Sequence, residues 1–229
     1  MEMMMQFKRA YHGGPISEAS DYTKQIRVQV TRGLTPAEIT MARSIFKNSL
    51  NYQQVKICRG NPFHNLTGNA QVLGNNITFP ADIYDKYSKG NNDFSNAADP
   101  NHQVWFIHEM VHIWQNQLGR STLAHGACIF VGGKYFGSGG TQNGQASHSP
   151  KAYDYDIVKD GIDFPHYSME QQAEVVSHYF RIIKFGQKAK FYHLKIYYEK
   201  CLDSFLQNPS EPLLLPKDIK WIECFDIIK

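Results

Sequence analysis

Two histidines that lie four residues apart, His108 and His112, give the clearest chemical signal in the sequence, and Glu109 directly follows the first. On a helix, residues four apart lie on the same face, so both imidazoles can point at one ion. Zinc binds histidine nitrogens at about 2.0–2.1 Å and lowers the pKa of its water from about 15.7 to about 7. Glu109 can then take that proton and pass it to a leaving amine. The spacing therefore predicts a catalytic zinc site.

The alternative is an amphipathic helix that carries two histidines by chance. The flanking sequence favours the metal site, because several apolar side chains would bury the motif: Val104, Phe106, Ile107, Val111 and Trp114. Asp99 and Pro100 are suited to cap and begin a helix, and Gly119 is suited to end it. We therefore expect a helix over residues 101–118 that holds the motif in the interior.

A catalytic zinc needs three protein ligands and an open position, and the third ligand must come from elsewhere in the chain. The segment IWQNQLGRST after His112 contains no histidine, and the next one is His125. Glu170 and Glu174 lie one helical turn apart in the segment EQQAE. One can bind zinc, and the other can accept the remaining N–H of a ligand histidine and so fix its tautomer. The alternative is a solvated acidic face, on which the two carboxylates would repel each other.

The segments that must position these residues predict a mixed fold. GLTPAEITMARSIF is typical of a helix that begins with a Thr35–Glu38 capping box, and SMEQ indicates a second box of Ser168 and Gln171 at the start of the helix that carries the glutamates. Further along, one stripe at helical spacing indicates a core-facing helix: Leu194, Tyr198, Cys201 and Phe205.

YQQVKICRG and NNITFPADIY are typical of strands, and NNITFP could be an edge strand that pairs with an extended peptide. Residues 132–152, rich in Gly, Ser and Asn, predict a long loop, and the apolar run IKWIECFDII predicts a segment that docks back onto the body. We find no internal repeat and no linker. We expect one α+β domain over residues 1–229, with an N-terminal extension (1–33) and a C-terminal helical extension (187–229).

The composition of the 229 residues is that of a globular protein, with 42% hydrophobic and 20% charged residues. The net charge of +3 is too small to argue for nucleic acid, and no stretch reaches the ~18 apolar residues of a membrane helix. The first residues lack the apolar core of a signal peptide, so we expect synthesis in the cytoplasm without a Sec signal. The four cysteines form no CxxC pair and do not indicate a zinc knuckle or a redox motif.

The order of the motifs resembles the gluzincin class of zinc peptidases, in which HExxH is followed on a later helix by a ligand glutamate in an ExxxD or ExxAD pattern. The matching string here runs from Glu170 to Glu174, with Glu in place of Asp. This resemblance implies a zincin-like fold, Glu170 as the third zinc ligand and Glu174 as the partner of a ligand histidine. Because Glu is one methylene longer than Asp, the reverse assignment stays open.

Three separated blocks also resemble bacterial Vgr-related and Rhs-associated proteins that are linked to type VI secretion: GLTPAEITMARSIF, FIHEMVHIWQNQLG and MEQQAEVVSHYF. The similarity spans residues 33–182 and is more specific than HExxH alone. It implies a zinc peptidase-like toxin or cargo domain that is loaded onto secretion machinery. Type VI secretion components and a cognate immunity protein are the partners that this implies.

Peptidases of this type commonly place a tyrosine or histidine near the zinc to stabilise the oxyanion. Four such residues lie close in sequence to the glutamates: Tyr153, Tyr155, His166 and His178. For each one alone, packing or surface exposure is the more common explanation. His178 lies one turn beyond Glu174 and so shares its face, and Tyr155 and His178 are the candidates that we carry forward.

The sequence thus predicts a zinc metallopeptidase in which His108, His112 and Glu170 hold the metal and Glu109 acts as general base and then acid. The expected substrate is a protein or peptide, and the expected role is that of an effector acting on a rival or host cell. A first alternative keeps this site but directs it at the peptide part of peptidoglycan. A second alternative is a zinc-stabilised adaptor of the secretion apparatus that has no catalytic activity.

Overall fold

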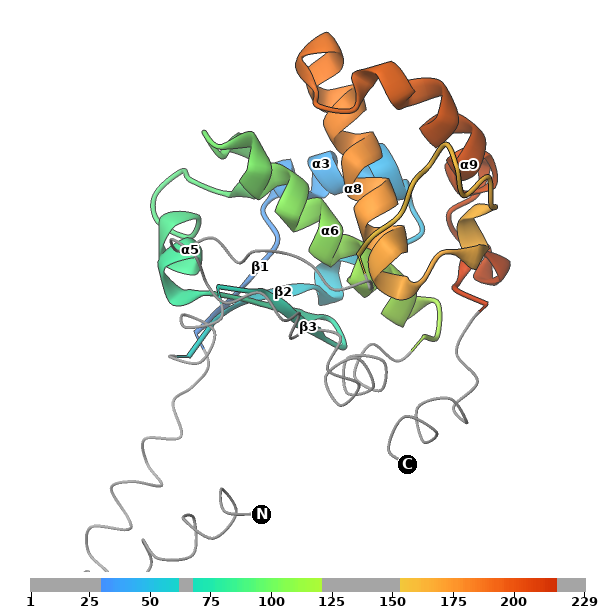
Figure 1. Cartoon of the computed structure of the whole chain (residues 1–229). Coiled ribbons are helices and arrows are strands. Elements are labelled where there is room, and N and C mark those ends of the chain that lie inside the picture. Colours follow the sequence, from blue (N-terminus) through green and yellow to red (C-terminus); the bar gives the residue numbers. More distant parts are fainter. Residues whose placement is uncertain (1–29, 62–67, 121–152, 218–229) are drawn as a thin grey trace, which may run out of the picture. The chain divides into compact units, whose positions relative to one another are not determined.

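The computed structural model describes three stretches of the chain: residues 30–61, 68–120 and 153–217. The helices and strands below belong to one compact unit, Thr31–Lys229. The loop predicted over residues 132–152 and the docking segment predicted from IKWIECFDII lie outside the described residues. The described part is a mixed α+β fold with a small sheet, as the sequence predicts (Figure 1).

The sheet has four strands in the described residues, in the order β1 (Thr31–Gly33), β2 (Lys56–Arg59), β4 (Asn76–Phe79) and β3 (Gln71–Leu73). β2 and β4 are parallel, and each outer strand is antiparallel to its neighbour. The prediction of NNITFP as an edge strand is wrong, because β4 has a partner on both sides. The edge beyond it is β3, which a two-residue turn at Gly74 and Asn75 joins to β4 in a hairpin.

The first described helix, α3 (Pro36–Phe46), begins as predicted with a capping box between Thr35 and Glu38. The Glu38 side chain is fully buried and accepts hydrogen bonds from Arg32 Nη1 and Nη2, both at 2.8 Å. Since Arg32 lies in β1 and also donates to the backbone oxygen of Tyr87 at 2.8 Å, this ion pair joins the sheet edge to α3. Shorter elements follow in the chain: η1 (Tyr52–Gln54), α5 (Ala81–Lys86) and η2 (Phe94–Asn96).

Two long helices pack side by side above the sheet (Figure 1). One is α6 (Pro100–Gln117), which Asp99 caps by accepting from the backbone N–H of Asn101. The chain leaves α6 through Gly119, whose φ of 104° suits glycine. The other is α8 (Met169–Phe185), which begins with the predicted capping box between Ser168 and Gln171. The predicted bounds of α6 and the predicted start of α8 are therefore confirmed to within one or two residues.

The core surrounds α6, which is buried along most of its circumference. The largest of its buried side chains, Trp114, donates from its indole nitrogen to Pro209 O at 2.6 Å. Its ring packs edge-on against Phe205 of α9 (Lys195–Gln207), with ring centroids 5.3 Å apart. The predicted α9 stripe is confirmed, because Tyr198 and Phe205 are buried and Leu194 and Cys201 pack against the core. The remaining short elements are η3 (Phe164–His166), η4 (Gly186–Lys188), η5 (Tyr192–Leu194) and η6 (Pro212–Leu214).

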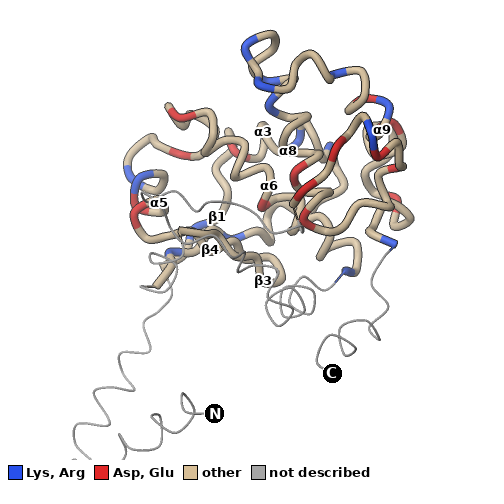
Figure 2. Tube along the Cα trace, viewed as in Figure 1, with Lys and Arg blue, Asp and Glu red and all other residues tan. Residues whose placement is uncertain are grey.

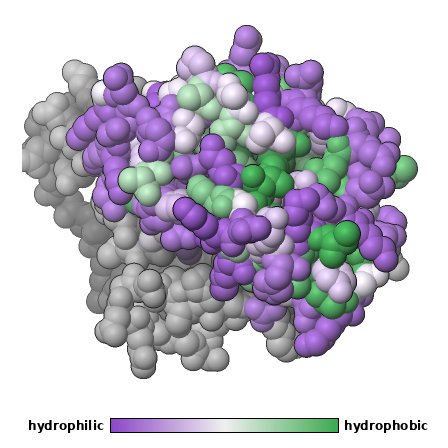
Figure 3. All heavy atoms as spheres, turned by 90° about the horizontal axis from the view of Figure 1, so that it is seen from above, coloured by the Kyte–Doolittle hydropathy of each residue, from purple (hydrophilic) through white to green (hydrophobic). Residues whose placement is uncertain are grey.

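On the face seen in Figure 3, the described residues are mostly hydrophilic, with apolar groups of atoms among the polar ones. Lys and Arg gather where α8 ends and the chain leads into α9, whereas Asp and Glu lie along the first half of α8 and the segment that precedes it (Figure 2). None of the helices in the described ranges is long and apolar enough to cross a membrane.

Candidate metal centre

The contact between α6 and α8 brings two histidines and a glutamate to one point. Glu170, in the first turn of α8, places Oε2 at 3.2 Å from His112 Nε2 and 3.5 Å from His108 Nε2. One ligand atom from each of the three residues lies within 4.8 Å of the others. Glu170 is only 3% exposed, and both histidines are nearly buried. Side chains from two helices therefore converge in the interior with their metal-binding atoms facing one another.

Burial and mutual attraction set the charges of this cluster. Burial alone would raise the pKa of Glu170, but the His112 and His108 imidazoles more than offset it and hold that pKa well below its usual range. Burial likewise would lower the pKa of His108, but hydrogen bonds to Glu170 and Glu174 hold it well above its ordinary value. The Glu170 carboxylate is therefore ionised at neutral pH, which is the form that binds metals.

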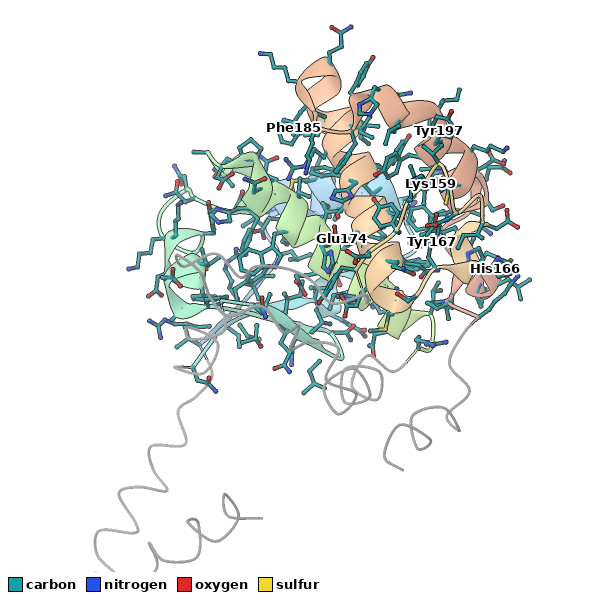
Figure 4. The ribbon with its side chains drawn as sticks, in the orientation of Figure 1. Lys159, His166, Tyr167, Glu174, Phe185 and Tyr197 are labelled. Atoms are coloured by element: carbon teal, nitrogen blue, oxygen red, sulfur yellow. The ribbon has the colours of Figure 1, made fainter. Side chains whose placement is uncertain are left out.

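Glu174 lies one turn beyond Glu170 and takes the opposite side of His108. Its Oε1 is 3.2 Å from His108 Nδ1, while its Oε2 is 3.2 Å from His178 Nε2. Figure 4 shows the Glu174 side chain on the side of α8 that faces α6. Glu170 faces Nε2 of His108, on the side of the ring where the three ligand residues meet. Glu174 faces Nδ1, on the other side of the same ring.

A chain of hydrogen bonds continues outward from Glu174. His178 Nδ1 lies 2.5 Å from Tyr155 Oη, and Tyr155 Oη lies 2.7 Å from Tyr198 Oη of α9. Burial lowers the pKa of His178 to about 4 and raises that of Tyr155, so both are neutral at pH 7. A neutral His178 that donates a hydrogen bond from Nε2 to Glu174 accepts one at Nδ1 from the Tyr155 hydroxyl. Tyr155 in turn accepts a hydrogen bond from the Tyr198 hydroxyl. Both nitrogens of His178 are thus engaged behind Glu174.

Glu109 lies on α6 between the two histidines in sequence and is 6% exposed. Burial raises the pKa of Glu109, although the neighbouring histidines act in the opposite direction. The indole N–H of Trp105, one turn earlier on α6, donates to Glu109 Oε1 at 3.0 Å. The carboxyl group is therefore held in place, and its pKa is shifted upward, which is the direction expected of a carboxylate that acts as a general base.

The other two aromatic and histidine candidates occupy different places. The Tyr153 ring lies beside that of His108, with centroids 6.3 Å apart and planes tilted by 31°. His166 ends the short helix η3 and lies at the periphery, well away from Glu174 (Figure 4). Of the four residues singled out in the sequence, Tyr153 is therefore adjacent to the cluster and His166 is remote from it.

Sequence reasoning missed three side chains that contact the cluster or its supports. Trp105 holds Glu109, and Gln115 places Oε1 at 2.9 Å from His112 Nδ1. Gln172, on α8, in turn accepts from Gln115 at 3.0 Å. Gln115 follows His112 by three residues and so shares its helix face, which is a signal that could have identified it.

The three converging residues fit a metal ion. Two imidazole nitrogens and a carboxylate oxygen form a ligand set typical of catalytic zinc. The other nitrogen of each histidine faces an oxygen acceptor, Glu174 for His108 and Gln115 for His112, which is the usual arrangement around metal-binding histidines. Within the described ranges the cluster contains three ligand residues, so a zinc ion held there would keep one position for water or substrate.

Comparison with known proteins relates this chain to a protein of type VI secretion. No family model matches the chain. The chain is 28% identical over 170 residues to the type VI secretion system spike protein VgrG2b of Pseudomonas aeruginosa. This match covers 73% of the chain but 14% of that protein. Among solved structures, the effector domain of Pseudomonas aeruginosa VgrG2b has a TM-score of 0.48 and 23% identity, and the match covers 78% of this chain and 91% of that one.

Proposed function

We propose that this chain is a zinc-dependent metallopeptidase-like effector domain that hydrolyses amide bonds. The observation that carries the proposal is the convergence of His108, His112 and Glu170 within 4.8 Å, with Glu109 buried beside them on the same helix. The arrangement of one helix with HExxH and a second with the glutamate supports a zincin-like active site. The proposed metal ligands are therefore His108, His112 and Glu170, with Glu174 as a supporting partner.

The side chains divide the chemistry between them. When bound, zinc supplies a Lewis acid that polarises a carbonyl group and lowers the pKa of water to about 7. Glu109 takes the proton of the attacking water and then donates it to the leaving amine. Trp105 engages Oε1 of Glu109, and we assign the proton transfer to Oε2, the oxygen that Trp105 does not engage.

The residues around the ligands then have distinct proposed roles. Tyr153, whose ring lies beside His108, is the better placed of the tyrosines to stabilise an oxyanion. Tyr155 and His178, which the sequence suggested for that role, are hydrogen-bonded to each other and through His178 to Glu174. We therefore assign Tyr155 and His178 to holding Glu174 in position.

A protein or peptide substrate is supported by the edge of the sheet. With β4 in the interior of the sheet, β3 is the outer strand on that side among the described strands, and β3 contacts α6. An extended peptide that adds to a sheet edge gains backbone hydrogen bonds along its length. We propose that β3, rather than β4, receives the substrate.

Delivery by a type VI secretion system is supported by the sequence similarity to VgrG2b, which covers most of this chain. Since the match covers 14% of that spike protein, the proposal concerns a domain that acts as an effector and not the spike as a whole. Secretion components and a cognate immunity protein are the partners we propose for it.

The test is elemental analysis of bound metal combined with substrate assays on three proteins: wild type, Glu109→Gln and Glu170→Gln. We expect one zinc per chain in wild type and Glu109→Gln, and strongly reduced zinc in Glu170→Gln. Glu199→Gln, in an exposed pair on α9, is the matched control and should bind zinc as wild type does. Casein cleavage should be seen with wild type and Glu199→Gln and be lost in Glu109→Gln.

Other outcomes would redirect or overturn the proposal. Release of peptides from purified peptidoglycan without casein cleavage would assign the same site to the cell wall. Zinc binding with no turnover on either substrate, and no effect of Glu109→Gln in a cell-killing assay, would indicate a zinc-stabilised adaptor. Wild-type protein that takes up no metal when zinc is added back would contradict the metal site itself.

A further inference from the structure

The two histidines of the cluster are hydrogen-bonded to different kinds of side chain. His108 Nδ1 faces the carboxylate of Glu174, whereas His112 Nδ1 faces the side-chain amide of Gln115 at 2.9 Å. A carboxylate can only accept a hydrogen bond from an imidazole N–H, but an amide presents either an acceptor oxygen or a donor nitrogen. The direction in which Gln115 is turned therefore decides which form of His112 it stabilises.

The surrounding acceptors determine that direction. Gln172 is fully buried, and its nitrogen donates to two backbone oxygens, Phe164 O at 3.0 Å and Leu214 O at 2.9 Å. Because backbone oxygens can only accept, the Gln172 nitrogen must face them and its oxygen must face Gln115. Gln115 Nε2 donates to this oxygen at 3.0 Å and to Met169 O at 3.1 Å.

With both of its N–H groups used in this way, Gln115 has only its oxygen to present to His112. The hydrogen bond at 2.9 Å then requires a proton on His112 Nδ1. Since a neutral imidazole carries one ring proton, Nε2 is left with a lone pair, and Nε2 is the atom that faces Glu170 at 3.2 Å. Reversing either amide would set an N–H against a donor or leave buried backbone oxygens without partners.

We propose that Gln115, oriented by Gln172, is a positioning residue that keeps the proton of His112 on Nδ1 and so presents Nε2 to the metal. This inference rests on the proposed metal site and deepens it. The hydrogen-bond chain ends on backbone atoms of three segments: the start of α8 at Met169, η3 at Phe164 and η6 at Leu214. One ligand of the cluster is thereby tied to the segment that follows α9.

The test is the zinc affinity of the intact protein, measured by competition with a chromophoric chelator at fixed pH. Gln115→Met keeps the length of the side chain but removes the acceptor, and zinc should bind about 10–100-fold more weakly. Gln115→Glu keeps an oxygen for His112 and loses the N–H groups, so zinc should bind at least as tightly as in wild type while the metal-free protein unfolds more easily. Gln172→Met should weaken zinc binding by less than Gln115→Met.

Gln103→Met is the matched control, because Gln103 is also a buried amide on α6 but donates only to Ala97 O, at 3.1 Å. Its zinc affinity should equal that of wild type. Equal affinities in Gln115→Met and wild type, or equal losses in Gln115→Met and Gln115→Glu, would overturn the inference while leaving the metal site intact. Wild-type protein that binds no zinc would instead refute the proposed function.

A second readout needs no variant and so does not depend on whether the substituted proteins fold. In zinc-loaded protein with 15N-labelled histidine, NMR should show the ring proton of His112 on Nδ1, protected from exchange, and Nε2 without a proton. A proton on Nε2, with Nδ1 bound to the metal, would contradict the proposed direction of the Gln115 amide.

Discussion

Replacing Glu174 by glutamine tests which glutamate of α8 binds the metal, because the sequence alone left the assignment open. In the structure, Glu170 contacts Nε2 of both histidines, while Glu174 contacts Nδ1 of His108 and Nε2 of His178. The change Glu174→Gln turns one acceptor oxygen into a donor. If the new amide N–H faces His108, it opposes the N–H at His108 Nδ1; if it faces His178, the His178 proton must move from Nε2 to Nδ1. No ligand atom of the metal is removed in either case.

The expected loss can be worked out from this contact. Loss of the partner behind a ligand histidine typically weakens metal binding about 10–100-fold, which corresponds to about 1.4–2.8 kcal/mol. The Glu174 side chain is 27% exposed, so water can replace part of the lost hydrogen bond, and we expect a value near the lower limit, about tenfold. Glu170→Gln removes a ligand from a site that is nearly buried, and its loss should be larger.

The assay is chelator competition on wild type, Glu174→Gln and Glu170→Gln, with stoichiometry from elemental analysis. We expect Glu174→Gln to hold one zinc per chain at saturating metal but with reduced affinity, and Glu170→Gln to hold much less than one. Retention of zinc by Glu170→Gln together with its loss from Glu174→Gln would exchange the two roles and refute our reading of the contacts.

Two further predictions concern the scaffold. Arg32→Met leaves the buried Glu38 carboxylate uncompensated and should lower the free energy of unfolding by about 3–5 kcal/mol. Arg59→Met breaks the exposed pair with Asp85 and should lower the free energy of unfolding far less. Similar losses for the two variants in urea denaturation would contradict this. Burial lowers the pKa of His102 below its ordinary 6.5, so the unfolded state binds more protons than the folded state once the pH falls below about 6.5, and stability falls there. The free energy of unfolding, measured from pH 7 to pH 5, should therefore decline more steeply in wild type than in His102→Gln, and parallel curves would show that His102 is not the cause.

Local signals explain what could be predicted from the sequence. The boundaries of α6 and α8 follow from caps that act within one turn, Asp99 in one case and Ser168 in the other. The helical spacing of His108, His112 and the two glutamates of α8 likewise places these residues on defined faces without knowledge of the fold. The helix positions and the residues that converge could be predicted for this reason.

Features that depend on long-range pairing could not be predicted. The three residues of β3 are too few to show an alternating pattern, so the place of β4 between two partners was missed. The contact between Gln115 and Gln172 spans 57 positions in sequence, and that between Tyr155 and Tyr198 spans 43. Buried polar partners of this kind become visible only when the packing of α6, α8 and α9 is known.

The difference between the two histidine supports has a consequence for Glu109. Glu170 and Glu174 together carry two negative charges, which balance the charge of one divalent cation, and the amide of Gln115 adds none. Burial already raises the pKa of Glu109, and a third carboxylate beside His112 would raise it further through repulsion between like charges. An amide at position 115 fixes the orientation of His112 without that repulsion. The chain thus supports both imidazoles without adding a charge that would raise the pKa of Glu109 further, as its proposed role as general base requires.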